Sequence, residues 1–365
     1  MTSRSYNFGL SAGGELMRFN SVIIFLILPL SFVAHGATIT VSPSGNDYAV
    51  IQKAIDAAHP RDIIKVQSGT YHENVNLNKE VTLRGVGNSV VDGGGKGSAI
   101  NLSADGVILE GFKVKNVEIC GIEINSNNNI IRFNNASDLG NSPGICLYEC
   151  EGNIVTNNIA TNNSEGFELD YSDGNEISYN VVSQLNKSLS TSGGITLVES
   201  NRNIIKGNLL YDNVFYGIGL AGYLVGSNKN TILDNTVSRS ENGIVIFGCN
   251  ENIIENNHVM DNQYGINITV NGPLNSTGNR IYRNSLLDNQ FNAYDNTNET
   301  MAVAGSGPNR WDDDSRGNYY SDLNCIDGNS DGICDSPYDI PGGMSVDRYP
   351  LMSFPAEVED YPSPN

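Results

Sequence analysis

The sequence predicts an all-β fold, a right-handed parallel β-helix with a short N-terminal capping helix. The first observation is a repeat, because an Asn-x-(Ile/Val)-x-x-Asn motif recurs seven times between residues 129 and 284. The second is composition, since 39 glycines and only 17% charged residues describe a chain that turns often. The third is the shortness of the apolar runs between turns, which favours strands over helices.

Successive copies of the motif are separated by 24, 22, 28, 27, 22 and 27 residues, which indicates a 22-residue coil with loops inserted at one corner. A Gly-(Ile/Phe)-x-(Leu/Ile) strand follows each turn. Because all copies run in the same direction, each strand can pair with its counterpart one coil later, ~4.8 Å away, without a long crossover. The central aliphatic residues of the motif are predicted to form the core: Ile131, Val155, Ile177, Ile205, Ile232, Ile254 and Ile281.

Asparagine at the corners of these coils has two physical explanations. It tolerates the left-handed backbone of a tight turn, and its amide can donate to and accept from the copies in neighbouring coils. Such ladders leave no buried amide without a partner. We therefore interpret these asparagines as scaffold.

An export signal is expected at the N-terminus. Met17-Arg18, an apolar run over residues 22–33 and the small residues after it follow the order of a signal peptide. We expect a secreted, extracellular or cell-surface protein, which would be periplasmic in a source with an outer membrane. The mature chain has no second apolar run, so no transmembrane segment is predicted.

The helical spacing of residues 50–58 predicts a helix that covers the N-terminal end of the stack, with Asp47 as its N-cap. Four segments are then expected: upstream residues and signal peptide over 1–36, the β-helix with its N-terminal cap over 38–300, a C-terminal cap over 301–354, and a disordered tail over 355–365.

A net charge of −20 excludes partners that are recognised through a basic surface. It opposes binding to nucleic acid and to anionic lipid, so neither is predicted. The surface also offers seven sequons as possible glycan attachment sites: Asn101, Asn135, Asn162, Asn186, Asn267, Asn275 and Asn298.

Six cysteines in an exported chain predict disulfides. Cys325 and Cys334 bracket a tight loop and are expected to pair. Cys150 and Cys249 share a repeat position four coils apart, too far to bridge in a stack. The pairing of Cys120, Cys146, Cys150 and Cys249 stays open.

Residues outside the repeats carry a family resemblance. The segments 51–55, 69–71 and 81–85, together with the asparagine repeats, resemble pectin-lyase-like β-helix proteins of the carbohydrate-binding and sugar-hydrolysis (CASH) type. That group includes NosD-like exported proteins and archaeal surface proteins. The C-terminal region resembles the same subgroup, through Trp311 and the 317–322 segment. The resemblance implies the β-helix fold over about residues 38–354, whereas the group's activities range from binding to lyase and epimerase chemistry.

Residues 327–335 have the spacing of the first part of a calcium-binding loop. Glycine follows the fifth position, as such loops require, and Tyr338 replaces the usual bidentate glutamate at position 12. An Asp/Asn/Gly turn without an ion is the alternative interpretation. We predict calcium, with these ligands: Asp327, Asn329, Asp331, Ile333 and Asp335.

One outward face could carry saccharide chemistry. Alternation along the strands places Glu123, Cys146 and Glu168 in one column, and Asn125, Tyr148 and Asp170 in the next. Glu168 and Asp170 lie ~7 Å apart along one strand, a spacing compatible with an acid/base pair. Tyr148 and Tyr171 could supply stacking surface for a sugar. A solvated acidic wall is the simpler interpretation of the same residues.

No convergent catalytic set is present, so the leading hypothesis is a non-catalytic protein that binds polysaccharide or builds the cell envelope. The alternative is a polysaccharide lyase, epimerase or hydrolase that uses Glu123, Glu168 and Asp170. A copper accessory role, which the NosD resemblance implies, is not favoured. Soft or imidazole ligands are scarce, since the mature chain keeps only His59, His72 and His258.

Overall fold

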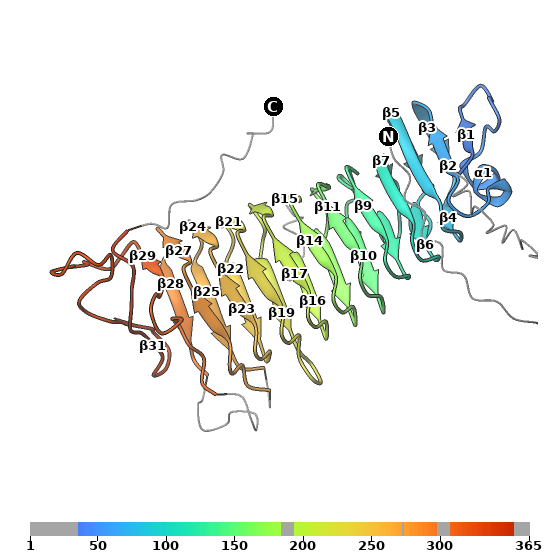
Figure 1. Cartoon of the computed structure of the whole chain (residues 1–365). Coiled ribbons are helices and arrows are strands. Elements are labelled where there is room, and N and C mark those ends of the chain that lie inside the picture. Colours follow the sequence, from blue (N-terminus) through green and yellow to red (C-terminus); the bar gives the residue numbers. More distant parts are fainter. Residues whose placement is uncertain (1–35, 184–192, 272–273, 298–306, 354–365) are drawn as a thin grey trace, which may run out of the picture. The chain divides into compact units, whose positions relative to one another are not determined.

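A computed structural model describes residues 36–183, 193–271, 274–297 and 307–353 (Figure 1). These residues form a stack of coils built from parallel strands, a right-handed β-solenoid. The predicted fold class is confirmed. The expected signal peptide and C-terminal tail lie outside the described residues. No helix in the described part of the chain is long and apolar enough to cross a membrane.

Three parallel sheets run along the stack, and each coil contributes a strand to them. The 12-stranded sheet contains β1 (Thr38–Val41), β2 (Ile63–Val66), β3 (Gly69–His72), β5 (Thr82–Asp92), β7 (Ile108–Lys115), β9 (Ile130–Arg132), β11 (Ile154–Thr156), β14 (Glu176–Ser178), β17 (Ile204–Lys206), β20 (Thr231–Leu233), β23 (Ile253–Glu255) and β26 (Arg280–Tyr282). The 10-stranded sheet contains β4 (Val75–Leu77), β6 (Ile100–Leu102), β8 (Ile122–Ile124), β10 (Ile145–Tyr148), β13 (Phe167–Asp170), β16 (Gly193–Val198), β19 (Tyr216–Ala221), β22 (Asn242–Phe247), β25 (Tyr264–Thr269) and β28 (Phe291–Asp295). The 7-stranded sheet contains β12 (Ile159–Thr161), β15 (Val181–Ser183), β18 (Leu209–Tyr211), β21 (Thr236–Ser238), β24 (His258–Met260), β27 (Ser285–Leu287) and β29 (Tyr319–Tyr320).

The core is a column of aliphatic side chains stacked coil on coil. Ile177 pairs with Ile205, and Ile205 with Ile232, so each predicted core position meets its own copy. All three side chains are fully buried, as predicted. In a core this narrow, every side chain touches copies above and below, and a polar substitution has no route to water.

Two asparagine ladders run along the stack. In the first, the backbone N–H of Asn203 donates to Oδ1 of Asn230 at 2.8 Å, and Nδ2 of Asn203 donates to the carbonyl of Ser172 at 2.9 Å. The first ladder joins Asn129, Asn153, Asn175, Asn203, Asn230, Asn252, Asn279 and Asn309. The second joins Asn134, Asn158, Asn180, Asn208, Asn235, Asn257, Asn284 and Asn318. Both ladders therefore extend one coil beyond the repeats visible in the sequence.

The expectation that the ladder asparagines adopt left-handed backbone is wrong. The corner residue with positive φ is the one immediately before the ladder asparagine, as at Asn128 (57°), Arg202 (57°) and Lys229 (59°). The ladder asparagines themselves have ordinary φ. Because the left-handed residue points its side chain to solvent, the position accepts arginine, lysine or glutamate, and the amide is selected one residue later.

The capping helix is present, as α1 (Ile51–Ala57), but the Asp47 N-cap is wrong. The Asp47 carboxylate instead accepts from the backbone N–H of Thr40, at 2.7 Å. Glu73, 22 residues on, accepts from the free N–H groups of Ile51 and Gln52, at 2.9 Å each. A carboxylate from the next coil thus satisfies the helix terminus.

The C-terminal end is closed by buried aromatic residues and a small hairpin, β30 (Tyr338–Asp339) with β31 (Val346–Asp347). Trp311 and Tyr320 are buried, and the ring of Tyr338 stacks on Tyr320 with 3.8 Å between centroids. Asp347 accepts from the N–H of Asn318 at 2.7 Å and from the Tyr320 hydroxyl at 3.1 Å. Burial raises the pKa of Asp347 to about 7, which these hydrogen bonds only partly offset.

Cys325 forms a disulfide with Cys334, as predicted. Cys120 forms a disulfide with Cys146, a pairing that the sequence left open. Cys150 and Cys249 are buried and unpaired, as their separation along the stack predicts.

A buried carboxylate fixes one exposed loop. Glu199 accepts hydrogen bonds of 2.6–3.0 Å from the backbone N–H groups of four consecutive residues, 223–226. Burial alone raises the pKa of Glu199, but these bonds outweigh it and lower the pKa. The loop so held displays Tyr223, Leu224 and Val225, which are 70%, 75% and 66% exposed.

We expect Glu199→Gln to loosen this loop, because an amide replaces one acceptor oxygen with a donor that faces backbone N–H groups. Amide exchange at residues 223–226 should accelerate at least ~10-fold, while exchange in β17 and β20 stays unchanged. Glu251→Gln, in an exposed ion pair with Lys229, is the control. Equal exchange in both variants would show that Glu199 does not hold the loop.

Candidate functional site

The outer face of the 10-stranded sheet brings together the acidic residues expected there. Glu123, Cys146 and Glu168 occupy matching positions on β8, β10 and β13. Tyr148 pairs with Asp170 in the neighbouring column. Leu147, between them, is fully buried, as alternation predicts, whereas Cys146 on the outward column is also buried, where it forms a disulfide with Cys120.

A groove of about 380 Å³ lies on this face. It is lined by Asn125, Tyr148, Glu149, Asp170 and Tyr171. Tyr171 is 58% exposed and sits on left-handed backbone (φ 49°) directly after β13. One carboxyl oxygen of Asp170, Oδ1, is shielded from solvent and has no hydrogen-bond partner. The groove thus combines two aromatic rings with carboxyl and amide side chains.

Sequence reasoning missed Glu165, which extends the acidic cluster towards β16. Thr196 donates to the Glu165 carboxylate at 3.3 Å, and its hydroxyl lies 3.1 Å from the hydroxyl of Tyr216. The ring of Tyr216 covers Gly193 and Gly219, where any Cβ would overlap it. One signal for Glu165 was present in the sequence. Glu165 and Tyr216 each stand immediately before the glycine that begins the strand motif, a position expected to be part of a turn.

Three carboxyl groups of this cluster have raised pKa values. Burial, and then the nearby Glu168, raise the pKa of Glu165 to about 8. Burial and Asp170 raise the pKa of Glu168, and burial raises that of Asp170. Burial and the same acidic neighbours raise the pKa of Tyr148, whose hydroxyl donates to Glu168 at 3.5 Å. We call Glu165, Glu168 and Asp170 the acidic triad.

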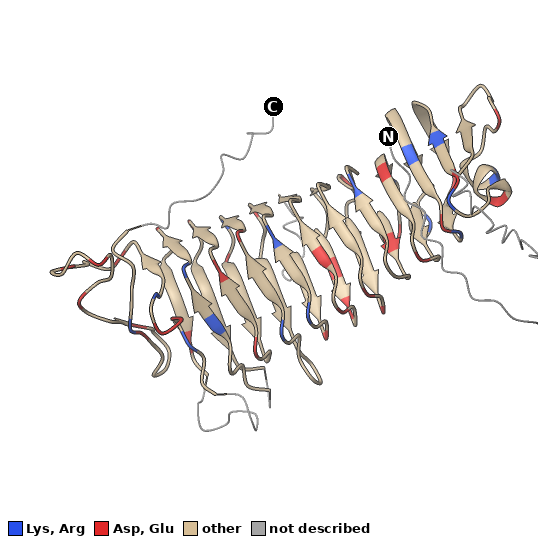
Figure 2. Ribbon diagram, viewed as in Figure 1, with Lys and Arg blue, Asp and Glu red and all other residues tan. Residues whose placement is uncertain are grey.

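No basic side chain offsets this charge within the sheet. Its described strands contain no lysine or arginine, and the ion pairs of the described chain involve other residues. Figure 2 shows basic residues on other strands and on turns. Carboxyls with raised pKa values beside a groove are typical of functional sites.

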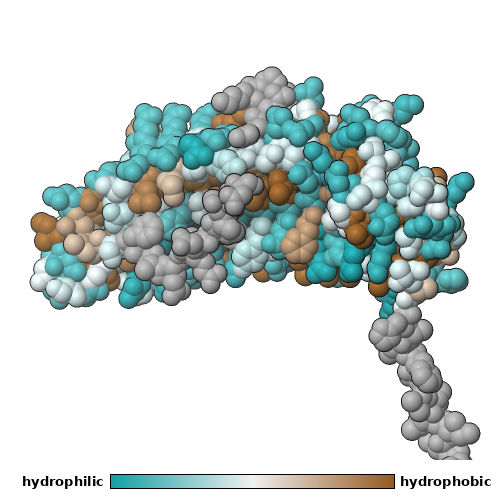
Figure 3. Space-filling view, turned by 90° about the horizontal axis from the view of Figure 1, so that it is seen from above, coloured by the Kyte–Doolittle hydropathy of each residue, from teal (hydrophilic) through white to brown (hydrophobic). Residues whose placement is uncertain are grey.

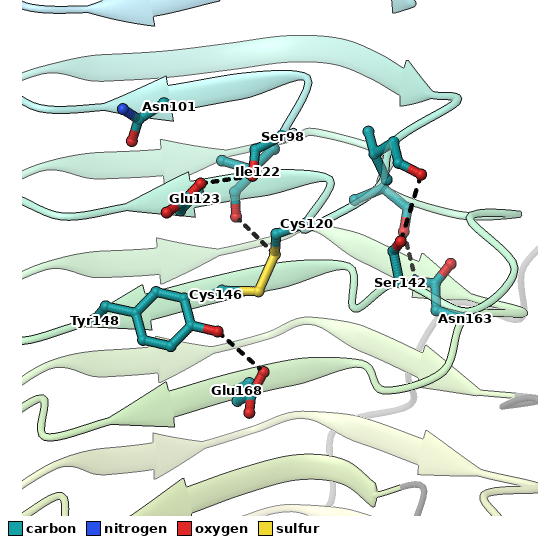
Figure 4. Close-up of a disulfide and its surroundings, with 12 residues drawn as sticks. Ser98, Asn101, Cys120, Ile122, Glu123, Ser142, Cys146, Tyr148, Asn163 and Glu168 are labelled. Carbon is teal, nitrogen blue, oxygen red and sulfur yellow. Dashed lines mark hydrogen bonds between the residues drawn. A yellow bond between two sulfur atoms is a disulfide. The ribbon is translucent and has the colours of Figure 1, made fainter. Parts of the chain in front are cut away.

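A disulfide ties the neighbouring coils together beside the groove. The Cys120–Cys146 bridge lies between Glu123 and Tyr148, as Figure 4 shows. Glu123 accepts from the Ser98 hydroxyl at 2.6 Å and from the Asn125 amide at 3.0 Å. Glu123 is therefore committed to structural hydrogen bonds, whereas Asp170 lines the groove.

Elsewhere the surface is mixed. In the face seen in Figure 3, hydrophobic patches are scattered among polar residues. Among the described sequons, Asn162 is exposed and Asn275 is buried, so only the first of these two is open to modification.

The predicted calcium loop is exposed, and its oxygen atoms face its own backbone. The Asp327 carboxylate accepts from the N–H groups of Asp331 and Gly332, at 3.2 and 2.9 Å. Asn329 and Asp335 likewise accept from backbone N–H groups of the loop. Tyr338, at position 12, hydrogen bonds to Asp322 and supplies no ligand to the loop. Calcium would have to draw these oxygens away from the amides, and its binding stays a prediction.

We predict that calcium raises Tm by stabilising this loop, since a ligand that binds only the folded state stabilises it. Asp331→Asn should abolish the shift, while Asp288→Asn, on an exposed corner of the β-helix, should keep it. Equal melting temperatures in calcium and in EDTA would exclude an occupied site.

The sequence matches the family described as periplasmic copper-binding protein (NosD), over residues 45–223 and 186–325. A cell surface glycoprotein of Methanothermus fervidus is 27% identical over 344 residues, which are 82% of this chain and 55% of the relative. A probable ABC transporter binding protein NosD of Stutzerimonas stutzeri is 29% identical over 44% of this chain and 38% of its own. The chain thus spans about half or less of the length of these relatives.

The A-module of a mannuronan C-5 epimerase from Azotobacter vinelandii shares the fold, with a TM-score of 0.60 and 17% identity over 72% of this chain and 79% of its own. At this identity the likeness shows the fold alone.

The metal in the family's description does not fit the residues present. His59 lies in the N-terminal region, His72 on β3 and His258 on β24, so the three histidines belong to different coils. Among the residues that the structure describes, no three His, Cys, Asp or Glu side chains are grouped to hold one metal ion. Copper needs imidazole or sulfur ligands in one place, which these positions do not provide.

Proposed function

The chain belongs to the NosD family, and from that premise we propose that it is an exported surface protein whose β-helix binds a saccharide, without catalysis, in the groove beside Tyr148 and Asp170. The observation that carries the proposal is the groove itself. Aromatic rings give a sugar face its stacking surface, and the side chains of Asn125, Glu149 and Asp170 that line the groove offer hydrogen bonds to its hydroxyls.

The comparisons support a glycan ligand and an extracytoplasmic location. A relative that matches 82% of this chain is a cell surface glycoprotein, and the family is described as periplasmic. A chain with the same fold belongs to a mannuronan epimerase. A surface protein that holds an envelope polysaccharide would bind a glycan and would lie outside the cytoplasm.

The test is an array of envelope and plant oligosaccharides probed with the full chain and with Tyr148→Ala and Tyr171→Ala. We expect each variant to bind at least ~10-fold more weakly, because an aromatic anchor in a groove contributes most of the affinity. Tyr179→Ala is the matched control, since Tyr179 is also exposed and left-handed (φ 54°) but lies between β14 and β15. Binding that survives both groove variants would contradict the proposal.

Catalysis is a second candidate because Glu165, with its pKa at about 8, holds a proton at neutral pH. A protonated carboxyl beside ionisable ones is the arrangement of a general acid with its partner base. Incubation with envelope polysaccharides followed by chromatography tests it. Products that disappear in Glu165→Gln would establish an enzyme, and unchanged chains with clear binding would leave the binding function.

A further inference from the structure

We propose that the saccharide-binding surface continues along the stack from the groove to the loop of residues 222–226, where Tyr223 is a further aromatic contact for a longer sugar chain. The inference rests on the proposed function and adds a second subsite to it. We call residues 222–226 the Glu199-held loop. It projects where β19 ends (Figure 1).

The Glu199-held loop begins at the same corner of the coil as Tyr171, two coils further along the stack. At this corner the residue after each strand donates its backbone N–H to the end of the next strand, at 3.0–3.3 Å: Tyr171 to Val198, Glu199 to Ala221, and Gly222 to Phe247. Tyr171, Glu199 and Gly222 therefore occupy equivalent positions in consecutive coils. At ~4.8 Å per coil, Gly222 lies ~10 Å from Tyr171 along the stack.

Hydrogen bonds draw the loop back towards the groove. The N–H groups of residues 223–226 all donate to the carboxylate of Glu199, which belongs to the coil between the loop and Tyr171. The loop therefore leans over that intermediate coil, on the side that faces Tyr171. Its exposed tip shortens the gap between the two aromatic residues, Tyr171 and Tyr223.

The loop also lies close to the outer face of the 10-stranded sheet. The ring of Tyr216 lies on that face, over Gly193 and Gly219. Burial raises the pKa of Tyr216 most, Glu165 adds to the rise, and Tyr223 is among the nearby groups that add further to it. Tyr223 is thus near the face on which the groove lies.

The surface between the groove and the loop is small and apolar. Asp170, which lines the groove, pairs with Val198, and Val198 pairs with Ala221, one coil further each time. Both apolar side chains are half-buried and alternate with fully buried leucines, so they point outward. A sugar chain that leaves the groove along the stack would pass over this apolar floor, to which it can turn its C–H groups, before it reaches Tyr223.

The loop is built to hold its shape. A Cβ at Gly222 would come within 2.3 Å of the Cα of Gly226, and Gly226 has a φ of 90°, so the neck of the loop needs both glycines. From the side opposite Glu199, the Asn271 amide donates to the Gly222 carbonyl at 2.7 Å. A loop fixed in this way loses little conformational freedom on binding, so Tyr223 can offer its ring at a small entropic cost.

The size of the surface favours a saccharide over a protein partner. The exposed tip consists of three side chains, Tyr223, Leu224 and Val225, and the floor adds one side chain per coil. A stable protein–protein interface uses roughly 20–30 residues a side. A narrow strip that joins aromatic residues along the stack suits a single extended sugar chain.

The experiment compares short and long sugar chains. Dissociation constants are measured by NMR titration for the disaccharides and hexasaccharides of β-1,4-linked glucose, N-acetylglucosamine and mannuronate. We expect Tyr223→Ala to weaken binding of the preferred hexasaccharide at least ~10-fold and to change that of its disaccharide less than ~2-fold, because only the longer chain reaches the loop. Tyr171→Ala should weaken both. Glu199→Gln should reproduce the loss for the hexasaccharide, because it loosens the loop that carries Tyr223.

The matched controls are Tyr179→Ala, at another corner, and Glu251→Gln, in an exposed ion pair, which should leave both constants unchanged. Hexasaccharide binding that depends on Tyr171 and is unaffected by Tyr223→Ala would overturn the inference and leave the proposed function standing. A shift in oligomeric state in Tyr223→Ala, seen by light scattering with unchanged sugar affinity, would assign the loop to contact with a second copy and would also overturn it. Absence of binding to all six sugars and to the array would overturn both.

Discussion

Ile205→Asp is expected to prevent the β-helix from folding. Ile205 is fully buried, because it pairs with Ile177 and Ile232 in the centre of the core. A carboxylate there has no partner and no path to solvent, so the cost should exceed about 4 kcal/mol. Thermal unfolding followed by circular dichroism, together with the soluble yield, measures the effect.

The neighbouring residue is the control. Ile204 lies on the same strand, β17, and is 41% exposed. Ile204→Asp should cost less than about 1 kcal/mol. A melting temperature of Ile205→Asp equal to that of Ile204→Asp would contradict the assignment of inward and outward positions.

Glu165→Gln is expected to stabilise the protein at high pH and to change little at low pH. The folded-state pKa of Glu165 is about 8, above the value of about 4.3 in an unfolded chain. The folded state therefore binds the proton more tightly, and the protein loses stability as the pH rises from about 4 through about 8. The amide variant cannot ionise and avoids this loss, worth roughly 2–4 kcal/mol at pH 9. Since the Glu165 side chain is only partly buried, we expect a stability gain at the lower end of this range.

Melting temperatures at pH 5 and pH 9 test this prediction, with Glu199→Gln as a control of opposite sign. The pKa of Glu199 is lowered, so its contribution is present above the unfolded pKa and is lost as the pH falls through the folded one. Glu199→Gln should therefore be most destabilising at high pH. A Glu165→Gln effect that is the same at both pH values would refute the raised pKa.

The repeats made the fold predictable because each coil copies its neighbour. The column from Ile177 to Ile232 and the pairing of Tyr148 with Asp170 follow from alternation along strands whose register the motif sets. The helix cap and one disulfide were missed because they depend on contacts between residues in different coils. Glu73 caps α1 across 22 residues, and no local pattern marks it.

The candidate site shows the same limit. Glu168 and Asp170 were found because they alternate with buried residues, whereas Glu165 precedes the strand and its direction depends on how the turn enters β13. The disulfide between Cys120 and Cys146 required knowing that their coils are adjacent with the side chains aligned. Raised pKa values come from burial, which one sequence does not reveal.

A crystal structure of the protein with a bound oligosaccharide tests the central claim most directly. We expect a sugar ring stacked on Tyr148 or Tyr171, with a hydroxyl within hydrogen-bond distance of the Asp170 carboxylate. An oligosaccharide bound on another sheet, with the groove unchanged, would contradict it.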